Sequence, residues 1–243
     1  MPVVAVPELF LGLLSLAIAA VWIGHIFANT IHDARHVRDT ISITGSARKP
    51  ISSNLVQWSL SVSGVAASPV EAARKLRGES KLTLAFLRRA GIPRAAITSE
   101  VVQSETIVTR ISKKQTRTTY RVSQGLEIST KQIDVVEGVS TRLGELLERG
   151  IAVSAQPLAY ISTDLAQAKL DALEAATEEA HRRAEILVKG LGGKLGAMRS
   201  SSLGVYQITP RDSTDVSDFG INYTSSRLKD VTAVVSATFA VRR

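Results

Sequence analysis

The sequence predicts an α+β domain that follows a single N-terminal transmembrane helix. An apolar run near the N-terminus is long enough to cross a bilayer. Beyond residue 40, segments of alternating apolar and polar residues are separated by segments with helical periodicity and recognisable helix caps. We therefore expect mixed or antiparallel sheets with three helices, of which the third is long and alanine-rich.

The apolar run covers residues 9–28 and carries no formal charge. Its only residues outside the apolar set are Gly12, Ser15, Gly24 and His25. At about 1.5 Å of rise per residue, such a helix covers the roughly 30 Å hydrocarbon core. The tail before it, residues 1–8, has no Lys or Arg. This favours a retained anchor over a cleaved signal peptide, although Ala17-Ile18-Ala19 offers a cleavage pattern inside the run.

A polar juxtamembrane linker, residues 29–39, joins the anchor to the domain at residues 40–243. The basic residues that follow the anchor are Arg35, Arg38, Arg48 and Lys49. By the positive-inside rule they would place the domain in the cytoplasm. Large domains translocate largely regardless of charge, so the residues alone leave the orientation open.

Strands are predicted where apolar and polar residues alternate. The pattern is clear in Val56, Trp58, Leu60 and Val62, which alternate with Gln57, Ser59, Ser61 and Ser63. It is weak in residues 96–110, which we still expect to form a strand. The remaining predicted strands are 41–44, 118–130, 151–161 and 232–241.

Three helices are expected between these strands. The first begins with Ser68-Pro69-Val70-Glu71, which has the pattern of a capping box, and it ends at Gly91. The second spans residues 132–149 with Val136, Leu143 and Leu147 on its buried stripe, and the third spans 164–190. The buried stripe expected on the third helix comprises Leu170, Leu173, Thr177, Ala180, Ala184, Leu187 and Leu191.

The chain has a formal charge of +8 and no cysteine. The absence of Cys excludes disulfide scaffolds, thiol nucleophiles and Cys-based metal sites. Residues 1–39 contain Arg35 and Arg38 against Glu8, Asp33 and Asp39, a net of −1, so the domain carries +9. We interpret this charge as a basic face near an anionic surface, and we expect no nucleic-acid partner.

No motif predicts catalysis, and we expect no enzyme, no catalytic residues and no cofactor. The glycine-rich segment 190–196 closes a helix, whereas a phosphate-binding loop must open one. Ser46-Ala-Arg-Lys49 matches S-x-x-K, but its serine ends a predicted strand. An enzyme outside the recognised motifs is the less favoured alternative.

A weak metal-site hypothesis concerns His32, His36 and Asp33, because residues four apart share one helix face. An oligomer would gather these histidines around an axis. The ordinary interpretation, which we prefer, is a set of polar residues at the membrane interface.

Basic residues also gather at a hairpin tip, residues 110–121, where Tyr120 is the only aromatic residue and is expected to point inward. They are Arg110, Lys113, Lys114, Arg117 and Arg121. A solvated tip is the default interpretation, and an acidic protein or lipid headgroups are the partners that would suit it. The long third helix and the polar stretch 209–227 are the other candidate interaction surfaces.

The order of these elements resembles the SIMPL-domain family, the YggE-like proteins of the bacterial envelope, over residues 40–243. The segments that carry the resemblance are Ile41-Ser-Ile-Thr-Gly45, Arg89-Ala-Gly-Ile92, Ile97-Thr98, Tyr120-Arg-Val-Ser-Gln-Gly-Leu126, and Arg183-Ala184 followed by Leu191-Gly192-Gly-Lys-Leu-Gly196.

The resemblance implies a non-enzymatic, stress-linked scaffold or interaction protein that forms a homo-oligomer, in some members a large ring. It also implies a single-pass protein of the inner membrane with its C-terminal domain in the periplasm, against the positive-inside count. The alternative function is a ligand- or lipid-binding module of an envelope transport or stress system.

Overall fold

The computed structural model describes residues 39–242, and it confirms a mixed α+β domain. The predicted anchor at 9–28 and the candidate metal ligands His32, Asp33 and His36 lie outside the described residues. Within the described range, no helix combines the length and the apolar character needed to cross a membrane.

The described chain divides into two compact units. The first contains residues 39–47, 173–204 and 234–242, and the second contains residues 48–172 and 205–233. The chain passes from one unit to the other within β1 (Thr40–Ser52), α5 (Leu165–Gly190) and β10 (Leu228–Arg242), and also between residues 204 and 205.

The strands form two five-stranded sheets. One has the order β1-β10-β8-β9, with β7 also pairing with β10, and the other has the order β3-β4-β2-β5, with β6 also pairing with β2. The remaining strands are β2 (Leu55–Ala66), β3 (Ile97–Ser112), β4 (Gln115–Thr130), β5 (Val153–Ala155), β6 (Ala159–Ile161), β7 (Lys194–Leu203), β8 (Gln207–Pro210) and β9 (Ile221–Asn222).

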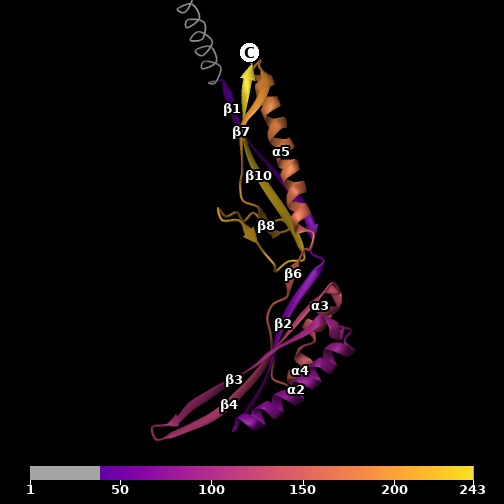
Figure 1. The fold of residues 1–243 in the computed structure, drawn as a ribbon, viewed down its shortest axis with the longest axis vertical. Coiled ribbons are helices and arrows are strands. Elements are labelled where there is room, and N and C mark those ends of the chain that lie inside the picture. Colours follow the sequence, from indigo (N-terminus) through magenta and orange to yellow (C-terminus); the bar gives the residue numbers. More distant parts are fainter. Residues whose placement is uncertain (1–38, 243) are drawn as a thin grey trace, which may run out of the picture. The chain divides into compact units, whose positions relative to one another are not determined.

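In the second unit, α2 (Pro69–Arg89) covers one face of the sheet at β2 and β4 (Figure 1). The predicted cap is present, because the Ser68 hydroxyl accepts a hydrogen bond from the backbone N–H of Glu71 at 3.3 Å. The helix stops where Gly91 adopts a φ of +99°, as glycine at a helix end allows. The core beneath it is centred on Trp58, whose indole N–H donates to the Gln156 carbonyl at 3.0 Å.

Two predicted elements of this unit are broken in the structure. The second predicted helix is divided into α3 (Ile133–Thr141) and α4 (Gly144–Glu148), so Leu146 is buried and Leu147 is 55% exposed. The strand predicted over 151–161 is two short strands, β5 and β6, both paired with β2. Pro157 lies between them and has no N–H to give to a sheet.

In the first unit, α5 lies along β1, β7 and β10 (Figure 1). The stripe predicted for this helix is right in part: Ala180 and Ala184 are buried, whereas Leu170 and Leu191 are 58% and 79% exposed. The buried stripe instead repeats every four residues and comprises Ala172, Ala176, Ala180, Ala184 and Val188. The helix and β1 approach each other so closely that a Cβ on Gly45 would lie 2.3 Å from the Ala176 carbonyl oxygen. Only small side chains fit on the facing side of the helix at this distance. The helix backbone therefore rests directly on the strand.

Candidate functional site

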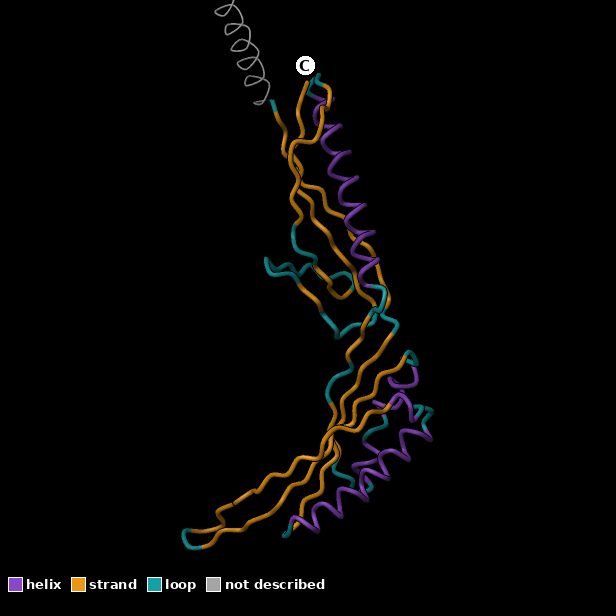
Figure 2. Tube along the Cα trace, viewed as in Figure 1, coloured by secondary structure: helices purple, strands orange, loops and turns teal. Residues whose placement is uncertain are grey.

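The outer part of the β3–β4 hairpin is the most exposed regular structure in the second unit. We call residues 107–119 the β-arm. Pairing of β4 with β2 ends at Tyr120, so beyond that residue β4 pairs only with β3. The arm extends past the helices as a two-stranded ribbon with a loop at its end (Figure 2). Such a ribbon is only marginally stable in water on its own, which suggests that something else contacts it.

The edges of the β-arm are open. Among the described residues β3 pairs only with β4, so its outer edge has no neighbouring strand along the arm. Val108 and Ile111 are 62% and 51% exposed. An edge with β-branched apolar residues and unpaired backbone groups is a template for pairing with another strand. The arm therefore has both the hydrogen-bonding groups and the apolar surface of an interface.

The structure brings the five predicted basic residues to the hairpin but not to a single face. Lys113 and Lys114 form the turn. Arg110 on β3 lies opposite Thr116 on β4, and the adjacent cross-strand pair is Thr109 on β3 and Arg117 on β4. Because successive pairs point to opposite faces, Arg110 and Arg117 lie on opposite faces of the ribbon. The arm thus carries four positive charges and no Asp or Glu, distributed over both faces and the tip.

Arg121 differs from the other four. It lies just below the arm and its guanidinium is 3.2 Å from the Glu105 carboxylate on β3. Its charge is therefore already paired. The neighbouring Tyr120 is half-buried against the core of the second unit, so its predicted inward orientation is confirmed.

An acidic segment with exposed apolar side chains lies elsewhere in the same unit. Residues 212–220 contain Asp212, Asp215 and Asp218 and no Lys or Arg, and all three carboxylates are exposed. Val216 and Phe219 are 83% and 97% exposed. This acidic segment lies within the polar stretch 209–227 that the sequence suggested as an interaction surface.

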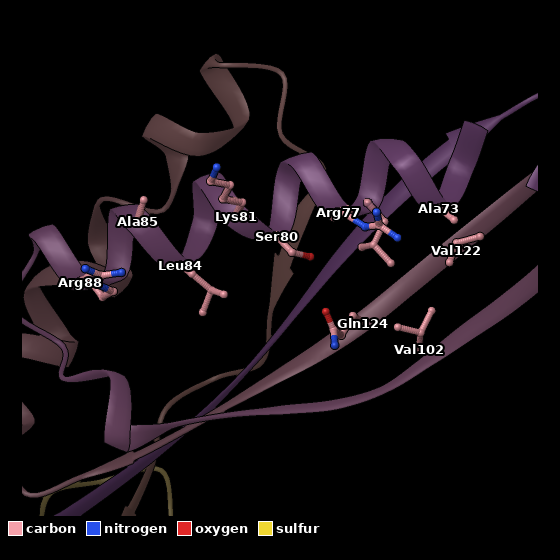
Figure 3. A pocket seen from close by; sticks show the side chains of 11 residues that line it. Ala73, Arg77, Ser80, Lys81, Leu84, Ala85, Arg88, Val102, Val122 and Gln124 are labelled. Carbon is pink, nitrogen blue, oxygen red and sulfur yellow. The ribbon is translucent and has the colours of Figure 1, made fainter. Parts of the chain in front are cut away.

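A groove between α2 and the β3–β4 sheet has a volume of about 520 Å³ (Figure 3). Ser80 and Leu84 point from α2 toward Gln124 of β4 and Val102 of β3. The walls are mainly apolar, and Arg77 and Arg88 of α2 also line the groove. The buried Ser80 hydroxyl has no hydrogen-bond partner among the described residues. A buried hydroxyl of this kind normally has a hydrogen-bond partner, so Ser80 is unusual on this buried face of α2.

Sequence reasoning did not identify this groove. The residue in the sequence that could have indicated the groove is Ser80, a small polar residue one turn after Leu76 on the buried face of α2. Both residues fit a helix that simply packs on a sheet. The space between α2 and β3 depends on how far β3 diverges from the helix, which the sequence does not encode locally.

The glycine-rich segment 190–196 is a helix end, as predicted. Gly192 has a φ of +78°, and the N–H of Gly193 donates to the Val188 carbonyl at 2.9 Å. This is the hydrogen-bond pattern of a C-terminal cap, not of a phosphate-binding loop. Ser46 of the S-x-x-K match lies inside β1, whereas that motif places its serine at the start of a helix.

The histidine and acidic side chains of the described domain do not form a metal site. In the part of the chain that the structure covers, no three His, Asp or Glu side chains are grouped so that they could hold a metal ion. His181 instead contacts the Phe239 ring edge-on, with 5.8 Å between the ring centroids.

Comparison with known proteins yields one family. The model of the SIMPL family, described as a protein of unknown function (DUF541), matches residues 41–239. No curated protein matches the chain. Among solved structures, the ligand-free regulatory subunit of aspartate kinase from Thermus thermophilus is 13% identical, with 79% of this chain and 88% of that chain covered. Its TM-score is 0.16, which does not indicate a shared fold.

Proposed function

The chain belongs to the SIMPL family, and from this membership we propose that it is a non-enzymatic scaffold of the bacterial envelope that assembles with copies of itself. In this proposal, residues 9–28 anchor it in the inner membrane and the described domain faces the periplasm. The single observation that supports assembly best is the β-arm, an open-edged ribbon that no other part of the described chain covers.

The β-arm and the acidic segment have complementary surfaces. The arm has four positive charges beside exposed Val108 and Ile111, and the segment 212–220 has three negative charges beside exposed Val216 and Phe219. Opposite charges steer association, and apolar contacts then stabilise it. We propose that the arm of one copy contacts the acidic segment of the next.

Such a contact joins two different surfaces of the same chain. Repeated from copy to copy, it generates a ring when the rotation closes. Chains confined to one membrane plane by an anchor meet at a high effective concentration, so individually weak contacts are sufficient. Lipid headgroups could satisfy the charge of the arm, but they would leave the backbone groups along its strand edge without hydrogen-bond partners from a second strand. For this reason we favour a protein partner.

A charge exchange tests this contact. The first variant changes Arg110, Lys113, Lys114 and Arg117 to Glu, and the second changes Asp212, Asp215 and Asp218 to Lys. We expect each variant alone to reduce the oligomer mass in detergent, measured by light scattering at micromolar concentration. The two variants combined in one chain restore opposite charges and should recover assembly.

A matched control changes Lys131, Arg149, Lys189 and Arg199 to Glu, because these exposed residues lie outside both surfaces. It should leave the oligomer mass unchanged. A strictly monomeric wild-type protein would refute the scaffold. Equal oligomer mass in all variants would refute the arm as its contact, and binding of the arm only to anionic vesicles would assign the arm to lipid.

The groove of Figure 3 supports a second function, the binding of an anionic amphiphile. Its apolar walls suit an acyl chain, while Arg77 and Arg88 suit a carboxylate or phosphate. We expect a fluorescent fatty acid to bind the wild-type protein and to bind the Arg77→Ala, Arg88→Ala double variant at least tenfold more weakly. Arg74→Ala, also on α2 but outside the groove, is the control. Equal affinities in all three proteins would rule out this function.

A further inference from the structure

Lys229 of β10 is a buried lysine in the second unit. It pairs with Pro210 of β8 and is only 3% exposed. An ammonium group is strongly hydrated in water, so its burial is unfavourable unless other groups replace the lost contacts. Burial lowers the pKa of Lys229 from its ordinary value. The buried ammonium of Lys229 therefore requires hydrogen-bond acceptors or a negative charge close to it.

The hydrogen bonds that the protein gives to Lys229 are incomplete. Its Nζ donates to the backbone carbonyl of Tyr160 at 2.6 Å. An ammonium has three donors, and across residues 39–242 no other hydrogen bond and no carboxylate within 4 Å is found for it. Two N–H groups of the ammonium thus have no partner among the residues that the structure describes.

The nearby carboxylates have other partners. Asp230 follows Lys229 in the strand, so its side chain points to the opposite face of the sheet, where it lies 3.7 Å from Arg48. Glu137 accepts a hydrogen bond from the Tyr160 hydroxyl at 2.7 Å. Neither carboxylate neutralises the ammonium.

Lys229 lines a cavity of about 130 Å³. The walls are formed by apolar residues that include Ile51 and Ile208, together with the polar residues Ser162, Asn222 and Thr224. A closed cavity of about 150 Å³ can hold a benzene molecule, so this space fits a small ligand of up to about six heavy atoms. Asn222 and Thr224 are exposed, so the cavity has a polar opening to solvent.

We propose that this cavity is a binding site for a small carboxylate, which Lys229 holds with its two remaining N–H donors. A carboxylate supplies the negative charge and the acceptors that the ammonium lacks. The apolar walls accommodate a short hydrocarbon part, and the polar opening gives it a path in from solvent. None of the residues that line this cavity lines the groove beside α2, so the two sites are distinct.

Acetate is the probe that tests the site. Saturation-transfer NMR on the full chain in detergent detects the acetate methyl group when it binds, with chloride keeping the ionic strength constant. We expect a signal for the wild-type protein and for Lys131→Met, which removes an exposed lysine. In Lys229→Met, which removes the charge but keeps the length of the side chain, we expect acetate affinity to fall at least tenfold.

The variant Asn222→Trp provides a second test that does not alter the buried lysine. An indole at the opening should reduce acetate binding while Lys229 remains in place, and this result decides the matter if Lys229→Met does not fold. Absence of a signal in the wild-type protein would overturn the proposal. The proposal would also be overturned if a folded Lys229→Met or Asn222→Trp protein bound acetate as tightly as the wild-type protein does.

Discussion

Replacing Gly45 with Ala tests how α5 packs on β1. A Cβ at this position would lie 2.3 Å from the Ala176 carbonyl oxygen, 2.4 Å from the Ala180 nitrogen and 2.7 Å from the Ala180 Cα. All three are backbone atoms, so no side-chain rotation relieves the overlap. To bring the shortest contact to 3.0 Å, the helix must move by about 0.7 Å from the strand.

The size of the effect follows from overpacking in cores. Inserting a methyl group into close-packed structure costs about 1–3 kcal/mol. For a chain of this size, about 1 kcal/mol corresponds to roughly 2–4 °C in Tm, so we expect Gly45→Ala to lower Tm by about 2–12 °C. Thermal unfolding of the full chain in detergent, followed by circular dichroism, measures this directly.

Gly78→Ala is the matched control, because a Cβ at this position in α2 has nothing within 4 Å. Alanine within a helix is more stable than glycine by about 0.5–1 kcal/mol, so this variant should raise Tm. The same substitution, Gly to Ala, is thus predicted to lower Tm at position 45 and to raise it at position 78. A Gly45→Ala protein with the Tm of the wild type would refute the direct contact between helix and strand.

Two further predictions concern hydrogen bonds of the second unit. Asn54→Ala should lower the free energy of unfolding by about 1–2 kcal/mol in a denaturant titration, because the Asn54 amide bonds to Thr163 through both of its ends and also to Asp164; an unchanged midpoint would contradict this. Burial and the bond to Glu137 raise the pKa of Tyr160 to about 12 from 10.0. The folded protein then keeps a proton that the unfolded chain releases, so stability should fall as pH rises from 10 to 12, and less steeply in Tyr160→Phe. Identical slopes in the two proteins would show that this phenol does not contribute.

The contact at Gly45 also explains which part of α5 the sequence could not predict. Leucines and alanines both recur at helical spacing along this helix, and hydrophobicity alone favours the leucines as the buried stripe. The alanines are buried because Gly45 on β1 lets the helix backbone approach the strand closely. That choice depends on a partner more than 120 residues away in the sequence. The boundaries of α5, in contrast, follow local cap signals and were predicted closely.

The β-arm shows a related limit. The alternation of Val56 to Val62 predicts β2 clearly because one face of that strand is buried. Residues 96–110 alternate weakly because β3 is exposed on both faces along most of its length, so no face selects for apolar side chains. The sequence predicted a basic hairpin tip, but it could not show how far the ribbon extends beyond the sheet. Lys229 was also missed, since a lysine at the start of a strand is ordinarily exposed.

The position of the β-arm in the assembled protein is the most direct test of the proposed scaffold. The chain has no cysteine, so a single Cys placed at Val108 can carry a photo-activated cross-linker in the native membrane without background labelling. The proposal predicts covalent multimers of the chain, with peptides from residues 212–220 attached to the cross-linker. Cross-links to lipid alone, or a labelled protein that remains monomeric, would contradict it.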